Sequence, residues 1–300
     1  ARVVACVGGT DMRAERRALD MGAHIVVGTP GRLRDHIERG SLVLSALAVA
    51  VLDEADEMLD MGFRDELEAI LDVTPDTRRT LLFSATIPPE IAALAKRYQR
   101  DALRIAATGE GGTHRDITYH AVLTAPREVE HALVNVLRWH DERAIVFCAT
   151  RAAVTRLHGN LTERGFSAVA LSGELTQAER NRALQALRDR RAQICVATDV
   201  AARGIDLPDL GLVVHAELPR DRDVLLHRSG RTGRAGRKGI AVLLVPATRR
   251  RLAERLLATA RIQAEWAPPP SAEAIRTRDG ERLVAEAATA AETAGAEPEA

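Results

Sequence analysis

Short apolar runs alternate along the chain with longer segments in which apolar residues recur at helical spacing. The runs have the length of buried strands, and the longer segments have the pattern of amphipathic helices. In the first third of the chain the predicted strands are Val3–Val7, Ile25–Val27, Ala48–Leu52 and Thr80–Phe83, and the predicted helices are Met12–Met21, Arg32–Arg39, Glu66–Leu71 and Pro89–Tyr98. This alternation predicts an α/β fold in which helices cover both faces of a parallel sheet.

The same alternation resumes beyond a glycine-rich stretch at residues 106–113, which suits a hinge. The predicted strands there are Ile117–Leu123, Ala144–Cys148, Ala168–Leu171, Gln193–Ala197, Leu212–His215 and Ile240–Val245, and the predicted helices are Val129–Trp139, Ala152–Arg164, Gln177–Arg188 and Asp223–Arg228. We therefore predict two parallel-sheet domains in tandem, at residues 1–107 and 117–266, with a hinge at 108–116. Residues 267–300 form a tail, rich in proline and then in alanine and glutamate, with a helix near Ile275–Ala288 before a disordered end.

Composition narrows the possible partners and compartments. The 42 basic and 42 acidic residues balance, so affinity for nucleic acid would have to come from a local basic surface. Cys6, Cys148 and Cys195 are scattered without any C-x-x-C spacing, which disfavours disulfide and zinc sites and fits the cytoplasm. No apolar run approaches the length that spans a membrane.

Two adjacent acids, Asp53 and Glu54, follow the predicted strand Ala48–Leu52. Ligands of open parallel sheets bind beyond the carboxyl ends of the strands. Such a pair suits a hydrated Mg²⁺ ion, with the second acid orienting or deprotonating an attacking water. The alternative is an acidic cluster on a surface loop.

Small hydroxyl residues, Ser84 and Thr86, follow the next predicted strand. They are placed to hydrogen-bond Asp56 across neighbouring strand ends. The alternative is that Thr86 caps the helix that begins near Pro88 and Pro89.

A third strand end leads into Thr29-Pro30-Gly31-Arg32 at a helix start. Free N–H groups at a helix start bind phosphate, and Arg32 adds positive charge. A simple helix cap explains the same residues equally well. Gly8 and Gly9 would let a backbone phosphate approach closely, or they form an ordinary turn.

Two downstream strings carry further candidates. Arg231 and Arg234 lie in a basic, glycine-interrupted stretch, and arginines of this kind stabilise charge on a transferred phosphoryl group. In the string Thr198–Asp206, Thr198 is placed to meet a nucleic-acid phosphate and Asp206 to meet a ribose. A solvated basic loop and an ordinary strand-to-loop turn are the respective alternatives.

The phosphate-binding loop G-x-x-x-x-G-K-[ST] is absent from the sequence. Lys96 and Lys238 are the only lysines, and neither follows a glycine. The chain also opens in a predicted strand without a starting Met. Both features predict a polypeptide truncated at its N-terminal side.

Together these strings resemble the DEAD-box RNA helicases of helicase superfamily two. The residues that carry the resemblance are Gly8-Gly9, Thr29–Arg32, Asp53–Asp56, Ser84–Thr86, Gln177 with Arg180, Thr198–Asp206 and His227–Arg234. Leu52–Leu59 and Ala201–Asp206 resemble the bacterial cold-shock DeaD-type branch. The resemblance covers Arg2 to about Trp266.

The resemblance implies two RecA-like domains that use ATP and Mg²⁺ to unwind short RNA duplexes. By the same resemblance, Asp53 and Glu54 manage magnesium and water, Arg231 and Arg234 act on the phosphoryl group, and Gly204 and Asp206 bind the nucleotide. Asp56, Ser84, Thr86 and His227 would couple hydrolysis to domain closure. The residues that would line or support the RNA track are Gly8, Gly9, Thr29, Gly31, Arg32, Gln177, Arg180 and Thr198.

The sequence departs from the family at its N-terminal side, where the adenine-reading Q motif and the Walker loop have no counterpart. We therefore expect the chain alone to be inactive, and its strand Thr80–Phe83 to form an open apolar edge. The alternative is a non-catalytic RNA-binding or regulatory module, although the intact Asp53, Glu54, Arg231 and Arg234 favour the helicase. The resemblance implies contacts with the RNA backbone, no membrane, and ribosomal or RNA-decay proteins as partners.

Overall fold

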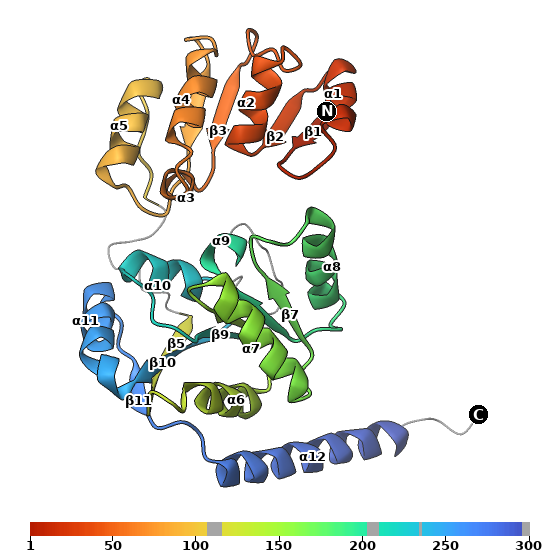
Figure 1. Cartoon of the computed structure of the whole chain (residues 1–300), viewed down its shortest axis with the longest axis vertical. Helices are drawn as coiled ribbons and strands as arrows, with labels where there is room; N and C mark the ends of the chain where they lie inside the picture. Colours follow the sequence, from red (N-terminus) through yellow and green to blue (C-terminus); the bar gives the residue numbers. More distant parts are fainter. Residues whose placement is uncertain (107–115, 203–209, 234–235, 296–300) are drawn as a thin grey trace. The chain divides into compact units, whose positions relative to one another are not determined.

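The computed structural model describes residues 1–106, 116–202, 210–233 and 236–295 (Figure 1). The chain divides into two compact units, Ala1–Gly109 (unit 1) and Glu110–Ala300 (unit 2). Most of the predicted hinge and the predicted disordered end fall outside the described residues. Among the described residues, no helix has both the length and the hydropathy needed to cross a bilayer.

Unit 1 contains two parallel two-stranded ribbons. Its elements are β1 (Val3–Cys6), α1 (Met12–Asp20), β2 (Ile25–Gly28), α2 (Pro30–Glu38), β3 (Val49–Leu52), α3 (Ala55–Asp60), α4 (Arg64–Asp72), β4 (Arg79–Leu82) and α5 (Pro89–Tyr98). Strand β1 pairs with β2, and β3 pairs with β4. Within the described residues β4 has no second neighbour, so the open edge expected there is present.

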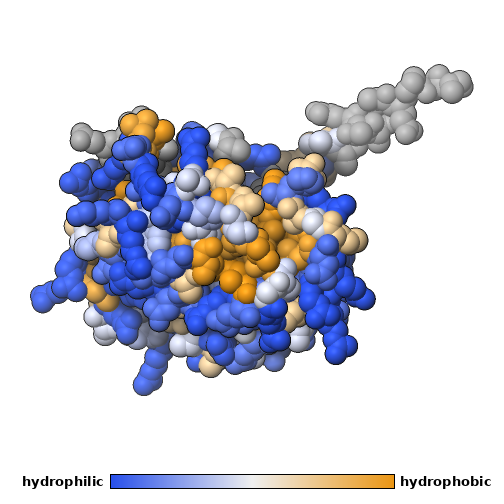
Figure 2. Space-filling view, turned by 90° about the horizontal axis from the view of Figure 1, so that it is seen from above, coloured by the Kyte–Doolittle hydropathy of each residue, from blue (hydrophilic) through white to orange (hydrophobic). Residues whose placement is uncertain are grey.

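Only one face of each ribbon in unit 1 is covered. Side chains alternate along the strands, so that Val4 and Leu52 are buried while Val3, Val27 and Val51 are 59%, 58% and 58% exposed. Apolar residues also gather in the middle of the face viewed in Figure 2. The prediction that helices cover both faces therefore fails for the described part of unit 1, although strands apolar on both sides are typical of doubly covered parallel sheets.

Unit 2 is built on a parallel sheet of seven strands in the order β11-β5-β10-β9-β6-β8-β7. The strands are β5 (Ile117–Thr124), β6 (Ala144–Phe147), β7 (Ala168–Leu171), β8 (Ile194–Ala197), β9 (Leu212–His215), β10 (Gly239–Pro246) and β11 (Glu265–Ala267). The helices are α6 (Val129–His140), α7 (Arg151–Glu163), α8 (Gln177–Arg188), α9 (Asp199–Ala202), α10 (Arg222–Ser229), α11 (Arg250–Ala260) and α12 (Ala272–Gly295), with a short 3₁₀ helix, η1, at Ala247–Arg249.

Both faces of the unit 2 sheet are covered, as the sequence predicts. One face carries Val146, Val196 and Val214 against α6 and α7. The other face carries Phe147 and Val213 against α8, α10 and α11. The alternation of the two sets along each strand explains why these strands read as continuous apolar runs.

The first half of the tail packs against unit 2, as far as Arg282. Strand β11 pairs with β5, and α12 packs against α6 beyond Pro270. Asn135 donates a hydrogen bond to the Pro270 carbonyl at 2.8 Å, Ile275 is 4% exposed, and Arg282 donates to the Trp139 carbonyl at 2.8 Å. Unit 2 therefore continues beyond residue 266, the predicted end of the second domain. Helix α12 is longer than the predicted helix Ile275–Ala288.

Candidate functional site

The acids Asp53 and Glu54 are presented to solvent at the carboxyl end of β3. An Asp53 carboxylate oxygen accepts the N–H of Glu54 at 3.0 Å, and both residues are exposed. Glu54 has a φ of 50°, a left-handed conformation that turns the chain from β3 into α3. No lysine or arginine in the described part of the chain pairs with either acid, and such open carboxylates are ligands that fit hydrated Mg²⁺.

The third acid of the motif, Asp56, is held by the loop that follows β4. Its Oδ2 accepts the Thr86 N–H at 2.8 Å and the Thr86 hydroxyl at 2.7 Å, while its own N–H donates to Ser84 Oγ at 3.2 Å. The hydrogen bonds expected between Asp56 and the two hydroxyl residues are therefore present. Thr86 does not cap α5, whose N-cap position is Pro88.

The loops after β1 and β2 carry the glycine pair and the second candidate phosphate site. Thr29 is the N-cap of α2, as one of the two interpretations expected, but its side chain makes no capping hydrogen bond. Glycine is required at position 28, where β2 packs closely against β1 and α2. A Cβ there would lie 2.5 Å from the Cys6 carbonyl oxygen and 2.6 Å from the Leu33 side chain. Gly9 adopts a φ of 81°, which favours glycine.

A buried polar cluster beneath these loops is not visible in the sequence. Glu15, Arg32 and His36 have side chains that are 7%, 11% and 0% exposed. Glu15 Oε2 lies 3.1 Å from Arg32 Nη1 and 2.8 Å from His36 Nε2, and Oε1 accepts the Val7 N–H at 3.1 Å. Burial alone would raise the pKa of Glu15, but hydrogen bonds and the nearby Arg32 charge lower it.

Cys6, Glu15 and His36 bring three potential metal-ligand atoms within 4.8 Å of one another. The carboxylate and imidazole atoms are already engaged with each other, and the Arg32 cation lies beside the carboxylate. Burial raises the pKa of the Cys6 thiol, which disfavours the thiolate that binds metal. The donor chemistry therefore fits a hydrogen-bonded cluster better than a cation site.

In unit 2 a buried ion pair links the segment after β8 to α10. Arg228 Nε and Nη2 lie 2.5 and 2.7 Å from the two carboxylate oxygens of Asp199, and Nη1 donates to the Glu217 carbonyl at 3.0 Å. The Arg228 side chain is 4% exposed, and its guanidinium carbon lies 5.2 Å from the centroid of the Phe147 ring. This pair was not predicted from the sequence.

The turn after α10 carries Arg231. It is anchored by Thr232, which is 2% exposed and whose hydroxyl donates to the Leu210 carbonyl at 2.6 Å. Gly233, at a φ of 66°, packs so tightly that a Cβ would lie 2.6 Å from the Ile117 side chain. His227 lies one turn before Arg231. Arg234, Gly204 and Asp206 lie outside the described residues.

The remaining candidates follow the neighbouring strands β7 and β8. Gln177 is the first residue of α8, which is capped by a reciprocal pair of hydrogen bonds between Thr176 and Glu179. Arg180 lies one turn later, and burial lowers its pKa. Thr198 is 8% exposed, and its hydroxyl accepts the Ala201 N–H at 3.4 Å. This contact matches the ordinary strand-to-loop turn, and a phosphate contact by Thr198 stays a prediction.

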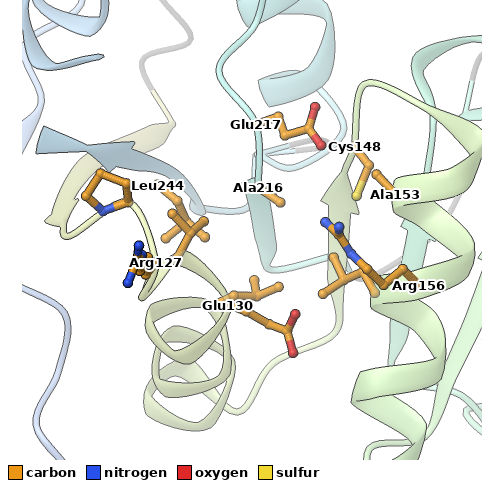
Figure 3. A pocket seen from close by; sticks show the side chains of 12 residues that line it. Arg127, Glu130, Cys148, Ala153, Arg156, Ala216, Glu217 and Leu244 are labelled. Carbon is orange, nitrogen blue, oxygen red and sulfur yellow. The ribbon is translucent and has the colours of Figure 1, made fainter. Parts of the chain in front are cut away.

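A pocket of about 260 Å³ lies elsewhere in unit 2, between α6, α7 and the ends of β6, β9 and β10 (Figure 3). Arg127, Arg156 and Glu217 line it, together with Cys148, whose pKa is raised to about 12 chiefly by burial. Among the described residues, none of the site residues expected from the sequence lines this pocket.

Known proteins match both units. Residues 1–95 match the DEAD/DEAH box helicase family model, and residues 128–236 match the helicase conserved C-terminal domain. The ATP-dependent RNA helicase DeaD of Mycobacterium tuberculosis is 39% identical over 277 residues, which are 92% of this chain and 49% of that protein. The chain thus spans about half the length of such curated relatives.

Two solved structures extend these matches to the fold. Dbp5 of S. cerevisiae, bound to RNA and ADP BeF3, superposes with a TM-score of 0.81 at 26% identity, covering 95% of this chain and 73% of that one. A DEAD box protein from Methanococcus jannaschii is 36% identical with a TM-score of 0.50, covering 89% and 72%. The acids at the end of β3, the loop in which Ser84 and Thr86 hold Asp56, and these matches lead to one conclusion: the chain belongs to the DEAD-box helicase family and has its two RecA-like domains.

Proposed function

We propose that the intact protein is an ATP-dependent RNA helicase that unwinds short RNA duplexes and remodels RNA. The observation that carries the proposal is the loop after β3, where two exposed carboxylates precede an Asp56 that Ser84 and Thr86 hold in place. A surface loop with an incidental acidic cluster has no need for such a tether. The DeaD protein is named as an RNA helicase, and the Dbp5 structure contains RNA.

ATP would supply the phosphoryl group, and Mg²⁺ would neutralise part of its charge. In this proposal Asp53 and Glu54 hold the ion through water, and Glu54 also orients the attacking water. Arg231 and Arg234 stabilise the charge that develops on the phosphoryl group. Gly204 and Asp206 contact the nucleotide.

Coupling between hydrolysis and domain closure would run through the Asp56 tether. Three hydrogen bonds join Asp56 to Ser84 and Thr86. Through them, a movement at the carboxyl end of β3 would be transmitted to the loop after β4. His227 supplies the corresponding group on unit 2.

RNA would be held through its backbone and its 2′-hydroxyl groups, without reading of base sequence. The residues that line or support this track are Gly8, Gly9, Thr29, Gly31, Arg32, Gln177, Arg180 and Thr198. The three described cysteines are buried and unpaired, in keeping with a reducing cytoplasm. Ribosomal or RNA-decay proteins are proposed as partners from the family resemblance alone.

The 300-residue chain has no G-x-x-x-x-G-K-[ST] loop, so we propose that it does not hydrolyse ATP alone. The test is RNA-stimulated ATP hydrolysis by this chain and by the same chain joined to its upstream coding sequence. We expect turnover only in the joined form. Turnover by the chain alone that is lost in Arg234→Ala would overturn the inference from the missing loop.

Glu54→Gln in the joined form separates the helicase from a non-catalytic RNA-binding module. We expect hydrolysis to fall at least about a hundredfold, because the water loses its orienting carboxylate. Glu90→Gln, an equal charge change at an exposed residue of α5, is the matched control. Equal hydrolysis by the two variants would contradict the role of Glu54, and no hydrolysis by the unsubstituted joined form would favour the non-catalytic module.

A further inference from the structure

The Glu15 carboxylate joins segments that are separate in the sequence. Its Oε1 accepts the Val7 N–H at 3.1 Å and the hydroxyl of Thr10, which places both ends of the Gly8-Gly9 turn on one oxygen atom. Its Oε2 meets Arg32 Nη1 at 3.1 Å and His36 Nε2 at 2.8 Å, both from α2. A carboxylate offers about four acceptor positions, so all of them are occupied.

Arg32 is enclosed by this cluster. Its side chain is 11% exposed, and both terminal nitrogens lie 3.4 Å from the Thr10 carbonyl oxygen in addition to the contact with Glu15. An Arg32 that reached for an RNA phosphate would have to leave a carboxylate that is itself 7% exposed. A buried charge stripped of its partner is strongly unfavourable, so the geometry opposes a direct phosphate contact.

His36 completes the anchor from the other side. It is fully buried, its Nε2 faces Glu15, and its Nδ1 lies 2.8 Å from Ser41 Oγ beyond the end of α2. The orientation of α2 is therefore tied at both its first and its last turn to one glutamate on α1. Thr29, Pro30 and Gly31 precede Arg32 directly and move with it.

We propose that Glu15 is a positioning residue for RNA binding: it holds the Gly8-Gly9 turn and the start of α2 in one arrangement, and Arg32 acts through Glu15 without touching RNA. This inference rests on the proposed function, in which these two segments contact the RNA backbone. The ligand is the phosphate backbone of single-stranded RNA, which main-chain N–H groups of the Gly8-Gly9 turn and of the start of α2 would bind.

Glu15→Gln distinguishes positioning from direct contact. If Arg32 contacts phosphate, removal of its carboxylate partner frees the cation and strengthens RNA binding. If Glu15 positions the segments, the amide presents an N–H₂ group toward Arg32 or His36 and binding weakens, by roughly tenfold for the loss of one charge-assisted hydrogen bond. The matched control is Glu38→Gln, the same charge change at a residue of α2 that is 58% exposed and pairs only with Arg34 among the described residues.

The measurement is the fluorescence anisotropy of a labelled oligo(U) of about ten nucleotides titrated with the 300-residue chain over a range of salt concentrations. A phosphate contact contributes about 0.7 to the slope of log Kd against log salt for single strands. We expect Arg32→Gln, which removes the charge, to weaken binding with an unchanged slope. A slope lowered by about 0.7, or tighter binding in Glu15→Gln, would overturn the inference.

Amide NMR spectra of the RNA-free chain separate failure of this inference from failure of the proposed function. Absence of RNA binding by the unsubstituted chain would count against the RNA-binding function alone. Independently, we expect Glu15→Gln to shift the amide resonances of Gly8, Gly9 and Gly31, and Glu38→Gln to leave them in place. Unshifted glycine resonances would overturn the positioning role.

Thr10→Val provides a second variant if Glu15→Gln unfolds unit 1. It keeps the side-chain shape and removes the hydroxyl, which contacts Glu15 Oε1 and also lies 2.6 Å from the Val7 carbonyl oxygen. We expect a shift confined to Gly8 and Gly9 and an RNA affinity lowered by about threefold, in line with a single neutral hydrogen bond. No change in either quantity would contradict the proposal.

Discussion

The ion pair between Arg228 and Asp199 allows a sharp test of what holds unit 2 together, through the substitution Asp199→Asn. In the native chain the guanidinium makes two hydrogen bonds to the carboxylate, at 2.5 and 2.7 Å. Asparagine keeps one acceptor oxygen, loses the second and removes the negative charge. Arg228, 4% exposed, then remains buried with only the Glu217 carbonyl at 3.0 Å as a full partner.

The magnitude follows from burial. Removing one partner of a fully buried ion pair costs about 3–5 kcal/mol. Asp199 is 34% exposed, so water replaces part of what is lost, and we expect about 2–3 kcal/mol. In a domain of this size the melting temperature would fall by roughly 4–12 °C.

Tryptophan fluorescence is the assay, because Trp139 and Trp266 both lie in unit 2. The control is Asp189→Asn, which removes an exposed pair with Arg191 in which the two side chains are 40% and 66% exposed. Such surface pairs contribute about 0–1 kcal/mol. If Asp199→Asn and Asp189→Asn melted at the same temperature, the reasoning from burial would be refuted.

Three further predictions follow from other contacts. Thr86→Val removes the hydroxyl that donates to Asp56 and should lower the stability of unit 1 by about 1–2 kcal/mol in urea titrations followed by circular dichroism; an unchanged midpoint would contradict this. Burial lowers the pKa of His140 to about 4, below its unfolded value, so the unfolded state binds more protons and unit 2 should lose stability as pH falls from about 6.5 to 4, a loss that His140→Asn should reduce. Val51→Lys places a charge on the exposed ribbon face and should suppress light scattering on warming; equal scattering by both chains would argue against aggregation through that face.

Most of the regular structure was predictable because its signals are local. The short strands coincide with the apolar runs of the sequence. Helix α2 begins where an N-cap threonine, Thr29, is followed by a first-turn proline, Pro30. The contact between Asp56 and Thr86 was also expected, since both residues follow strands that pair in parallel. The six-residue α3, the four-residue α9 and the three-residue β11 were not predicted because elements so short carry no clear periodicity. The eleven-residue α11 was also not predicted, although its apolar residues recur at helical spacing.

The buried charges were not predictable from the sequence. Arg32 meets Glu15 across 17 positions, and Arg228 meets Asp199 across 29. Among 42 acidic and 42 basic residues, no local rule selects these partners. Arg32 was expected to line or support the RNA track, and its burial beside Glu15 was not foreseen.

The sequence by itself determined the alternation of strands and helices, the strand ends that carry the candidate chemistry and the family to which the chain belongs, because periodicity and short motifs are properties of neighbouring residues. Only the tertiary structure decided which of those residues face solvent and which are buried in hydrogen bonds and ion pairs that hold loops together. Burial and pairing depend on chain segments that meet in space, as Glu15 meets Arg32 and His36. The same residue type therefore serves as an open carboxylate at Glu54 and as an internal anchor at Glu15.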